Sequence, residues 1–418
     1  MITEDILDFK EVTQMNVLDK FLRYIQIDSP SDPKADKIPS NDIELNVAYQ
    51  LEKEMKEMGL SNVRIKSGTV YGYLPATEGY EDKTPVGFIA HMDTAPEFNG
   101  YGVKPQIIEN YDGGDVLLKG SGHILSVKTY PRLAELKGQK LITTDGTTLL
   151  GADDKAGIAE ILTAVETIIK EGIPHGQIAV AFTPDEEIGH GVDLFDVEGF
   201  EAPLAYTVDG GIWNEICYEN FNAASAVVEF NGYSIHPGRA KGKMVNSQYM
   251  AFEFNDLLPK FDKPEHTRGF EGFIHLIGTN GNTEKTTLQY IIRDHDAAKL
   301  RAKKRTMEMI ADFTNKKYGE GSCVLTIKDQ YRNMKEMILP HFELVEYAEN
   351  AIRALGGEPV SEAARGGTDG AMLCYKGLPC PNLGTGGMNA HGRFECITEE
   401  NMIKCTNVII EVIKQFAK

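Results

Sequence analysis

The sequence lacks the long apolar run of a membrane protein and the basic surplus of a nucleic-acid-binding protein. Its apolar runs fall well short of the ~18 consecutive residues that a membrane-spanning helix needs. Acidic residues number 62 and basic residues 43, which gives a net charge of −19. A charge of this sign repels phosphate backbones and anionic bilayers. We therefore expect no membrane and no nucleic acid among the partners.

Cysteine is scarce, and no secretory signal is recognisable. The six cysteines are scattered and never form CxxC, which argues against a zinc-thiolate site and a disulfide framework. The acidic N-terminus, MITEDILDFKEV, has no basic region followed by an apolar one. These absences predict reduced thiols and a cytoplasmic location. Neither GxGxxG nor GxxxxGK followed by Ser or Thr occurs, so a nucleotide-binding enzyme is the weakest functional alternative.

What is present is an ordinary globular composition. The chain has 418 residues, 42% of them hydrophobic and 25% charged, which suggests two domains or three. Helical patterns occupy 12–27 and the segment between Ser40, a candidate N-cap, and Gly59. Another amphipathic helix begins at GADDKAG. Continuous apolar runs, typical of strands buried on both faces, lie at 86–90, 177–183 and 202–208.

Strands that alternate with helices predict an α/β domain with a mixed, largely parallel sheet and helices on both faces. The polar segment 96–150 is expected to be a long functional loop. From residue 222 the pattern changes to β-α-β-β-α-β, the order of a ferredoxin-like α+β unit. We therefore predict one α/β domain from 1–221 and 332–418, with a ferredoxin-like domain, 222–331, inserted into it.

Histidine and acidic residues follow the predicted buried strands, where ligands bind in open α/β sheets. His91 comes directly after the run at 86–90, and Asp93 can hold its second ring nitrogen. An ordinary loop histidine beside a turn aspartate is the alternative. Asp153 opens a helix, and helix capping is the commoner role of an aspartate there.

Three acids, including Glu186 and Glu187, follow the run at 177–183. Adjacent carboxylates repel one another unless a cation is near, although a solvated turn has the same pattern. Asp209 follows the run at 202–208, where a simple turn residue is the alternative. His391 lies in a glycine-rich loop, and taken alone it would not indicate a functional site.

Taken together, these residues indicate a metal centre. Five of them suit two ions that share a carboxylate, and the set is His91, Asp153, Glu187, Asp209 and His391. Imidazole with carboxylate favours two zinc ions per subunit, with cobalt or manganese as possible substitutes. Glu186 is left over beside a ligand, where hydrolysis needs a general base.

The chain resembles the co-catalytic metallopeptidase family that includes carboxypeptidase G, aminoacylase and the diaminopimelate desuccinylases. The resemblance covers essentially the whole length and implies a zinc-exopeptidase-like fold with a lid at 222–331. It is carried by HMDTAP at 91–96, ENYDGGD at 109–115, TTDGTTLLGADDKAGIAEI at 143–161, FTPDEEIG at 182–189, YTVDGG at 206–211, SIHPG at 234–238, RGGTDG at 365–370 and NAHGRFE at 389–395.

The resemblance assigns roles to these positions. It implies that His91, Asp153 and Asp209 bind one zinc, while Asp153, Glu187 and His391 bind the other. Asp93 would lie behind His91, Glu186 would accept the proton of the attacking water, and the Asp153–Asp154 peptide would be cis.

The same resemblance implies a set of substrate-binding residues. His236 would stabilise the oxyanion and Arg293 would hold a substrate carboxylate. The backbone of the RGGTDG loop, with Gly367, Thr368 and Asp369, would line the peptide. Arg293 also has a plain alternative as the structural partner of Asp294.

The implied function is a dizinc aminopeptidase that removes the N-terminal residue from short peptides, chiefly tripeptides. A related dizinc carboxypeptidase or N-acyl amino acid hydrolase is the alternative within the family. A metal-binding protein without turnover is the alternative outside it, and the spare base Glu186 argues against that. The sequence leaves open a homodimer through the lid domain.

Overall fold

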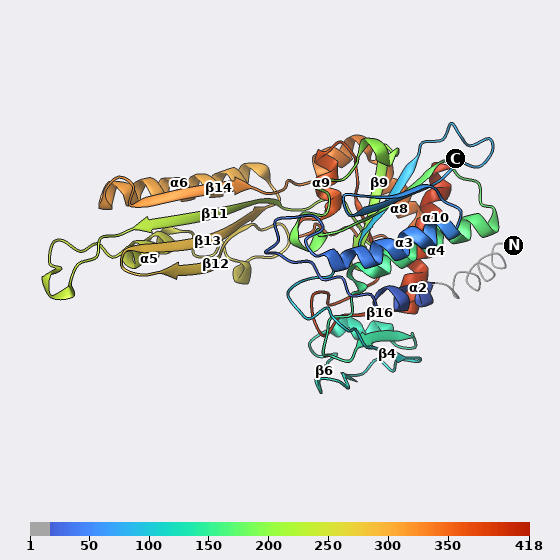
Figure 1. Cartoon of the computed structure of the whole chain (residues 1–418), viewed down its shortest axis with the longest axis horizontal. Helices are drawn as coiled ribbons and strands as arrows, with labels where there is room; N and C mark the ends of the chain where they lie inside the picture. Colours follow the sequence, from blue (N-terminus) through green and yellow to red (C-terminus); the bar gives the residue numbers. More distant parts are fainter. Residues whose placement is uncertain (1–16) are drawn as a thin grey trace. The chain divides into compact units, whose positions relative to one another are not determined.

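The computed structural model describes residues 17–418, which form two compact units (Figure 1). Helix α2 (Val17–Tyr24) covers part of the helix expected over 12–27; residues 12–16 lie outside the described range. Unit 1 consists of the chain up to Tyr218 together with Glu336–Glu362 and Thr368–Lys418. Unit 2 consists of Glu219–Lys335 and the short segment Ala363–Gly367.

Unit 1 is built on a seven-stranded sheet of order β1-β2-β8-β3-β9-β15-β10. The four strands from β8 to β15 are parallel to one another, while β1, β2 and β10 are antiparallel to their neighbours. This confirms the mixed, largely parallel sheet. The strands are β1 (Ser61–Lys66), β2 (Thr69–Leu74), β3 (Val86–His91), β8 (Ile178–Thr183), β9 (Leu204–Gly210), β10 (Ile216–Cys217) and β15 (Asn382–Gly384).

Helices cover both faces of this sheet. Neighbouring residues of β9 point to opposite faces: the Tyr206 hydroxyl donates to Leu344 O of α8, and its ring contacts Phe416 of α10. Thr207 lies on the other face against Gly370 of α9. The long helix α4 packs on β3 and β9. The helices of unit 1 beyond α2 are α3 (Leu45–Glu57), α4 (Ala152–Glu171), α8 (Glu343–Ala354), α9 (Asp369–Tyr375) and α10 (Glu399–Phe416), and the short α7 (Lys335–Ile338) spans the boundary between the units.

The segment 96–150 is not the long loop that the sequence predicted. It forms β4 (Pro105–Ile108), the hairpin β5–β6 (Val116–Leu117 and Ile124–Leu125) and β7 (Leu141–Thr144). Strand β7 pairs with β4 on one side and with β16 (Cys396–Thr398) on the other. Buried apolar residues such as Leu118 and Leu133 give this part its own small core. They come from short apolar stretches of one to three residues separated by polar ones, too short to show a helical or alternating period.

Unit 2 has the expected element order. It comprises β11 (Asn222–Asn231), α5 (Ser247–Leu257), β12 (Phe273–Gly281), β13 (Lys285–Asp294), α6 (Ala297–Tyr318) and β14 (Cys323–Asp329). The strands form an antiparallel sheet of order β12-β13-β11-β14. Side chains of α5 and α6 pack with alternate residues of these strands in one hydrophobic cluster.

The cap of the second helical segment was predicted wrongly. Asn41, not Ser40, caps the 3-10 turn Asp42–Glu44 that leads into α3. Ser40 instead links two loops: its hydroxyl accepts from Asp32 N–H, and its own N–H donates to the Asp185 carboxylate at 2.7 Å. The segment before α3 is therefore tied to the acidic loop after β8.

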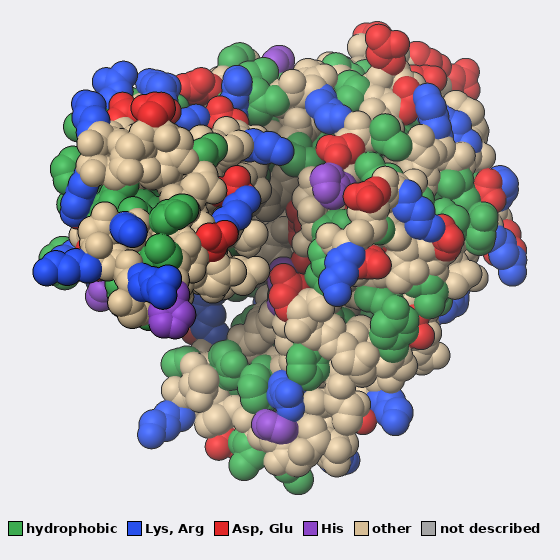
Figure 2. Space-filling model, turned by 60° about the vertical axis from the view of Figure 1, so that its left-hand side comes forward, with side chains coloured by type: hydrophobic (Ala, Val, Ile, Leu, Met, Phe, Trp, Pro, Cys, Tyr) green, Lys and Arg blue, Asp and Glu red, His purple; other side chains and the backbone are tan. Residues whose placement is uncertain are grey.

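Within residues 17–418, no helix is both long enough and apolar enough to cross a lipid bilayer. On the face drawn in Figure 2, acidic and basic side chains are interspersed rather than segregated by sign.

Candidate metal centre

The acidic and histidine residues singled out above lie at the carboxyl edge of the parallel strands in unit 1. His91 is the last residue of β3, and Asp209 is the second-last residue of β9. Glu186 and Glu187 follow β8 directly, in a short 3-10 turn. Because parallel strands end at the same edge of a sheet, three segments far apart in the sequence meet there.

Asp153 lies between the two histidines. Its Oδ1 is 2.9 Å from His91 Nε2, and its Oδ2 is 3.3 Å from His391 Nε2. His391 Nε2 is also 2.9 Å from Glu187 Oε2. The two oxygens of Asp153 thus face different imidazoles, so its side chain contacts both histidines rather than acting as a simple helix cap.

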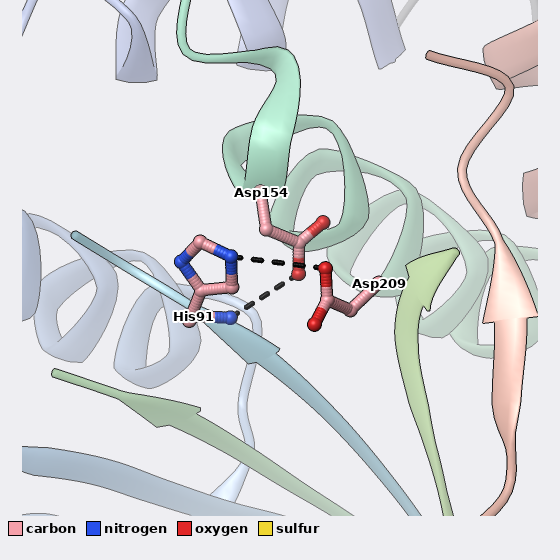
Figure 3. Close-up of side chains that lie close together, drawn as sticks. All are labelled: His91, Asp154 and Asp209. Carbon is pink, nitrogen blue, oxygen red and sulfur yellow. Dashed lines mark hydrogen bonds and ion pairs between the residues drawn. The ribbon is translucent and has the colours of Figure 1, made fainter. Parts of the chain in front are cut away.

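A second aspartate joins the centre on the side of Asp209. His91 Nε2 is 3.7 Å from Asp209 Oδ1, and the His91 N–H donates to Asp154 Oδ2 at 3.2 Å (Figure 3). Ligand atoms lie within 4.8 Å of one another in two groups, His91 with Asp154 and Asp209, and His91 with Asp153 and Glu187. The sequence interpretation gave Asp154 no part in the centre; only the path of the backbone brings it there.

Asp93 is fully buried and connects two parts of the centre. Its Oδ1 is 3.3 Å from His91 Nδ1, and its main-chain oxygen is 3.1 Å from the same nitrogen. Its two carboxylate oxygens also accept from the N–H groups of Glu186 and Glu187 at 3.0 and 3.2 Å. Asp93 therefore fixes the backbone of the acidic turn as well as the imidazole of His91.

The start of α4 departs from helical geometry where it carries the acids. Gly151 precedes it with φ 76°, a value that favours glycine. Asp153 and Asp154 have non-helical backbone angles, and the peptide between them is cis, as expected.

Glu395 holds this turn in place. The sequence had predicted no role for it. It is 1% exposed and accepts from the N–H groups of Leu150, Gly151 and Asp153 at 2.7, 2.9 and 3.0 Å. Glu395 stands in the NAHGRFE motif, four residues after His391. The motif could be recognised in the sequence. The N–H groups that donate to Glu395 lie more than 240 residues earlier, so their contact with it could not be predicted.

Burial and mutual repulsion set the ionisation of these carboxyl groups. Desolvation, helped by neighbouring carboxylates, raises the pKa of Asp209 and Glu186 well above their usual range. Burial raises the pKa of Glu187 to about 7. In Asp153 the hydrogen bonds from His391 and His91 outweigh the effect of burial and lower the pKa. Hydrogen bonds to Asp153 and Glu187 raise the pKa of His391 to about 11. Most of these buried carboxyl groups therefore resist ionisation as they stand, and a bound cation would favour their charged form.

The donor atoms fit divalent cations. Imidazole nitrogens and carboxylate oxygens are the ligands that zinc takes in hydrolytic sites. Glu187 Oε1 is buried and has no hydrogen-bond donor among the described residues, which leaves an acceptor aimed into the group. Beside it, Glu186 is only partly buried, and its backbone N–H is held by Asp93.

Two of the predicted substrate-binding residues belong to unit 2. His236 is exposed, and its Nδ1 accepts from Gly238 N–H at 3.2 Å. Arg293 in β13 donates to the carbonyl oxygens of Ala224 and Ile292, both at 3.0 Å. These local contacts neither require nor exclude a bound peptide, and the two roles stay predictions.

The RGGTDG loop crosses the boundary between the units. Gly367 belongs to unit 2, where an added Cβ would lie 2.7 Å from the ring of Tyr331. Thr368 caps α9 by accepting from Ala371 N–H. Asp369 is 3% exposed and accepts from the Thr183 hydroxyl at 2.7 Å. The structure thus gives all three residues a local role, while their contact with substrate stays a prediction.

Comparison with known proteins places this site in a family. The model of Peptidase family M20/M25/M40 matches residues 143–415, and the chain belongs to that family. Among its relatives is peptidase T of Geobacillus sp. (strain WCH70). The two sequences are 52% identical over 403 residues, an alignment that covers 96% of this chain and 98% of the relative.

Two solved structures share the fold. Aminopeptidase PepT from Bacillus cereus ATCC 10987 has a TM-score of 0.77 at 24% identity, covering 97% of this chain and 99% of the other. A tripeptidase from Staphylococcus aureus subsp. aureus Mu50 has a TM-score of 0.78 at 22% identity, covering 97% and 98%. Both alignments extend over nearly the full length, so the fold of this chain is that of these peptidases.

Proposed function

We propose that this chain is a metallo-aminopeptidase that removes the N-terminal residue from short peptides, chiefly tripeptides. The observation that carries the proposal is the convergence of His91, Asp153, Asp209, Glu187 and His391 around one point, with Glu186 beside them and free of any ligand role. The names of its relatives, peptidase T, an aminopeptidase and a tripeptidase, support the substrate class.

Two zinc ions, with cobalt or manganese as substitutes, would polarise the scissile carbonyl and lower the pKa of water when bound. His91, Asp153 and Asp209 would hold one ion. Asp153, Glu187 and His391 would hold the other, with one oxygen of Asp153 directed to each. Asp154, which contacts the backbone of His91, is a further candidate ligand on the Asp209 side.

Glu186 acts as the general base in this proposal. Its backbone is fixed by Asp93, and its carboxyl group interacts electrostatically with Asp209, His91 and Glu187. Its raised pKa matches a group that must first accept a proton from the attacking water and then return it to the leaving amine. Asp93 holds His91 in one orientation throughout, because it contacts the imidazole nitrogen that faces away from Asp153.

The proposal extends to the domains, the lid, the oligomeric state and the location of the protein. Residues 1–221 and 332–418 would form the catalytic domain and 222–331 a lid that supplies His236 and Arg293, with a homodimer through the lid as a further prediction. All six cysteines are buried and none of them forms a disulfide bond in the described part of the chain, which supports a reducing, cytoplasmic location.

The test combines substrate choice with metal content. Purified protein should contain about two divalent ions per chain and should release alanine, not glycine, from Ala-Gly-Gly. Release of glycine would indicate the related carboxypeptidase instead, and cleavage of only an N-acetylated tripeptide would indicate the N-acyl hydrolase. Glu186→Gln should keep its metal and lose about 10²- to 10⁴-fold in turnover. Glu198→Gln, in an exposed acid at the start of the 3-10 helix Glu198–Phe200, is the matched control. Undiminished turnover in Glu186→Gln would remove Glu186 from the mechanism.

A further inference from the structure

Two cavities of unit 1 meet at one carboxylate beside the metal centre. One, of about 420 Å³, lies between the loop at Pro30–Asp32 and residues 96–101. The other, of about 410 Å³, is lined by Pro33, Ala35, Ile188 and His190, and also by Glu187 of the centre. Glu97 lines both cavities, so its side chain stands at the point where a bound molecule could pass from the centre into either one.

Glu97 borders the centre without being part of it. Its Oε2 is 3.9 Å from His391 Nδ1, beyond hydrogen-bond distance, and its side chain is 59% exposed. His391 presents its other nitrogen, Nε2, to Asp153 and Glu187. The Glu97 carboxylate therefore lies on the outer side of His391, where it can accept hydrogen bonds from a ligand.

The carboxylates around His391 already have contacts within the centre, although one oxygen of Glu187 has no donor. Asp153 and Glu187 contact His391, both oxygens of Asp93 accept backbone N–H groups, and Glu395 accepts three. Asp369 is buried against Thr183. Glu97 is thus an exposed acid next to the centre with both oxygens available.

An aminopeptidase needs such a group close to its reacting atoms. In a peptide with a free N-terminus, the α-nitrogen and the scissile carbonyl carbon are joined through a single Cα and lie only about 2.5 Å apart. The α-ammonium group must therefore sit at the rim of the metal centre, where the positive charge of bound cations would repel it. A carboxylate at that rim offsets the repulsion. It only accepts hydrogen bonds, which matches an ammonium group that only donates them.

We propose that Glu97 binds the α-ammonium group of the substrate and makes the enzyme select peptides with a free N-terminus. This inference rests on the proposed function, because it assigns the selection of the N-terminus within the same site. The cavities on either side of Glu97 would then receive the side chain of the first residue.

The competing interpretation is that Glu97 orients His391. A carboxylate commonly fixes the second nitrogen of a metal-bound imidazole, and its loss weakens metal binding about 10- to 100-fold. The 3.9 Å separation and the exposure of Glu97 favour contact with substrate. The two roles differ in what they change: an orienting residue affects metal binding and all substrates alike, whereas an ammonium-binding residue affects only substrates that carry the amine.

The experiment compares trialanine with propionyl-alanyl-alanine, which differs only in lacking the α-amino group. In the metal-loaded wild type, kcat/KM for trialanine should exceed that for the propionyl compound. Glu97→Gln should lower kcat/KM for trialanine about 10- to 100-fold, mainly through KM, and leave the propionyl compound unaffected. Metal content should not change. Glu78→Gln, in an exposed acid after β2, removes the same charge elsewhere and should change none of these values.

Binding measured without turnover gives a second readout. In a Glu186→Gln background, calorimetry should show that Glu97→Gln weakens trialanine binding and not binding of the propionyl compound. If wild type cleaves trialanine and Glu97→Gln keeps the full preference for it, the inference is wrong while the proposed function stands. Parallel losses on both substrates, or lost metal, would make Glu97 a positioning residue for His391. A wild type that cleaves no trialanine would instead overturn the proposed function.

Discussion

Replacing Glu395 by glutamine tests whether the turn before Asp153 is held by a single buried carboxylate. Glu395 is 1% exposed and accepts three backbone N–H groups: Leu150 and Gly151 donate to one oxygen and Asp153 to the other. An amide has one oxygen, so at least one of these donors must face an NH₂ group. Losing one hydrogen bond to a charged acceptor costs about 1.5–3 kcal/mol, and the bonds that remain become weaker. We expect Glu395→Gln to lower the free energy of unfolding by about 2–4 kcal/mol.

The same change should loosen metal binding, because Asp153 contacts both His91 and His391. Loss of a group that orients metal ligands typically costs about 10- to 100-fold in affinity. Urea unfolding of the metal-free protein measures the first effect, and competition with a chromogenic chelator measures the second.

Glu400→Gln is the matched control. Glu400 also accepts from a backbone N–H, that of Lys140 at 3.0 and 3.1 Å, but a glutamine oxygen can keep that bond. We expect a loss below about 1 kcal/mol and unchanged metal affinity. If Glu395→Gln matched this control in both measurements, the role assigned to Glu395 would be refuted.

Two further predictions concern stability. Glu54 in α3 is buried, yet hydrogen bonds led by that from Tyr24, with Arg23 also donating, lower its pKa below the ordinary 4.5. Because the folded-state pKa is the lower one, this stabilisation is present above about pH 4.5 and is lost as the pH falls through the folded value. Glu54→Gln should cost about 1–3 kcal/mol at pH 7 and less at pH 3; equal losses in urea unfolding at both pH values would contradict this. In Gly157→Ala, the new Cβ would lie 2.1 Å from Val208 O, so α4 and β9 must separate at a cost of about 1–3 kcal/mol or more. If Gly157→Ala kept the stability and the metal content of the wild type, the expected clash between α4 and β9 would be refuted.

The central sheet could be predicted because its strands carry a simple signal. The runs at 86–90, 177–183 and 202–208 are uninterrupted and apolar, and each became a central parallel strand, β3, β8 and β9. Once those strands are parallel, the residues that follow them must share one edge. The positions of His91, Glu187 and Asp209 follow from that topology rather than from any property of the residues alone.

Other features depended on contacts that no local pattern encodes. The strands β5 and β6 have two residues each, too few for an alternating pattern, so 96–150 was mistaken for a loop. Helix α9 was not predicted, because it has only seven residues and follows a pair of glycines. The N-cap residue Thr368 was the one local signal of its start. Asp154 joins the centre because the backbone leaves helical geometry at that point. Capping rules assume a regular helix start and cannot anticipate it.

The late position of His391, the last of the proposed ligands in the chain, has a consequence for synthesis on the ribosome. His391 follows His91 by 300 residues, and its loop is closed by the pairing of Met388 with Cys396 and of β16 with β7. At about 5–20 residues per second, a nascent chain would display His91 for roughly 15–60 s before His391 is made. During that interval the growing polypeptide holds Asp153 without Glu395 behind it. If His391 is a ligand as proposed, hydrolytic competence arrives only after the segment that carries His391 and Glu395 has been translated.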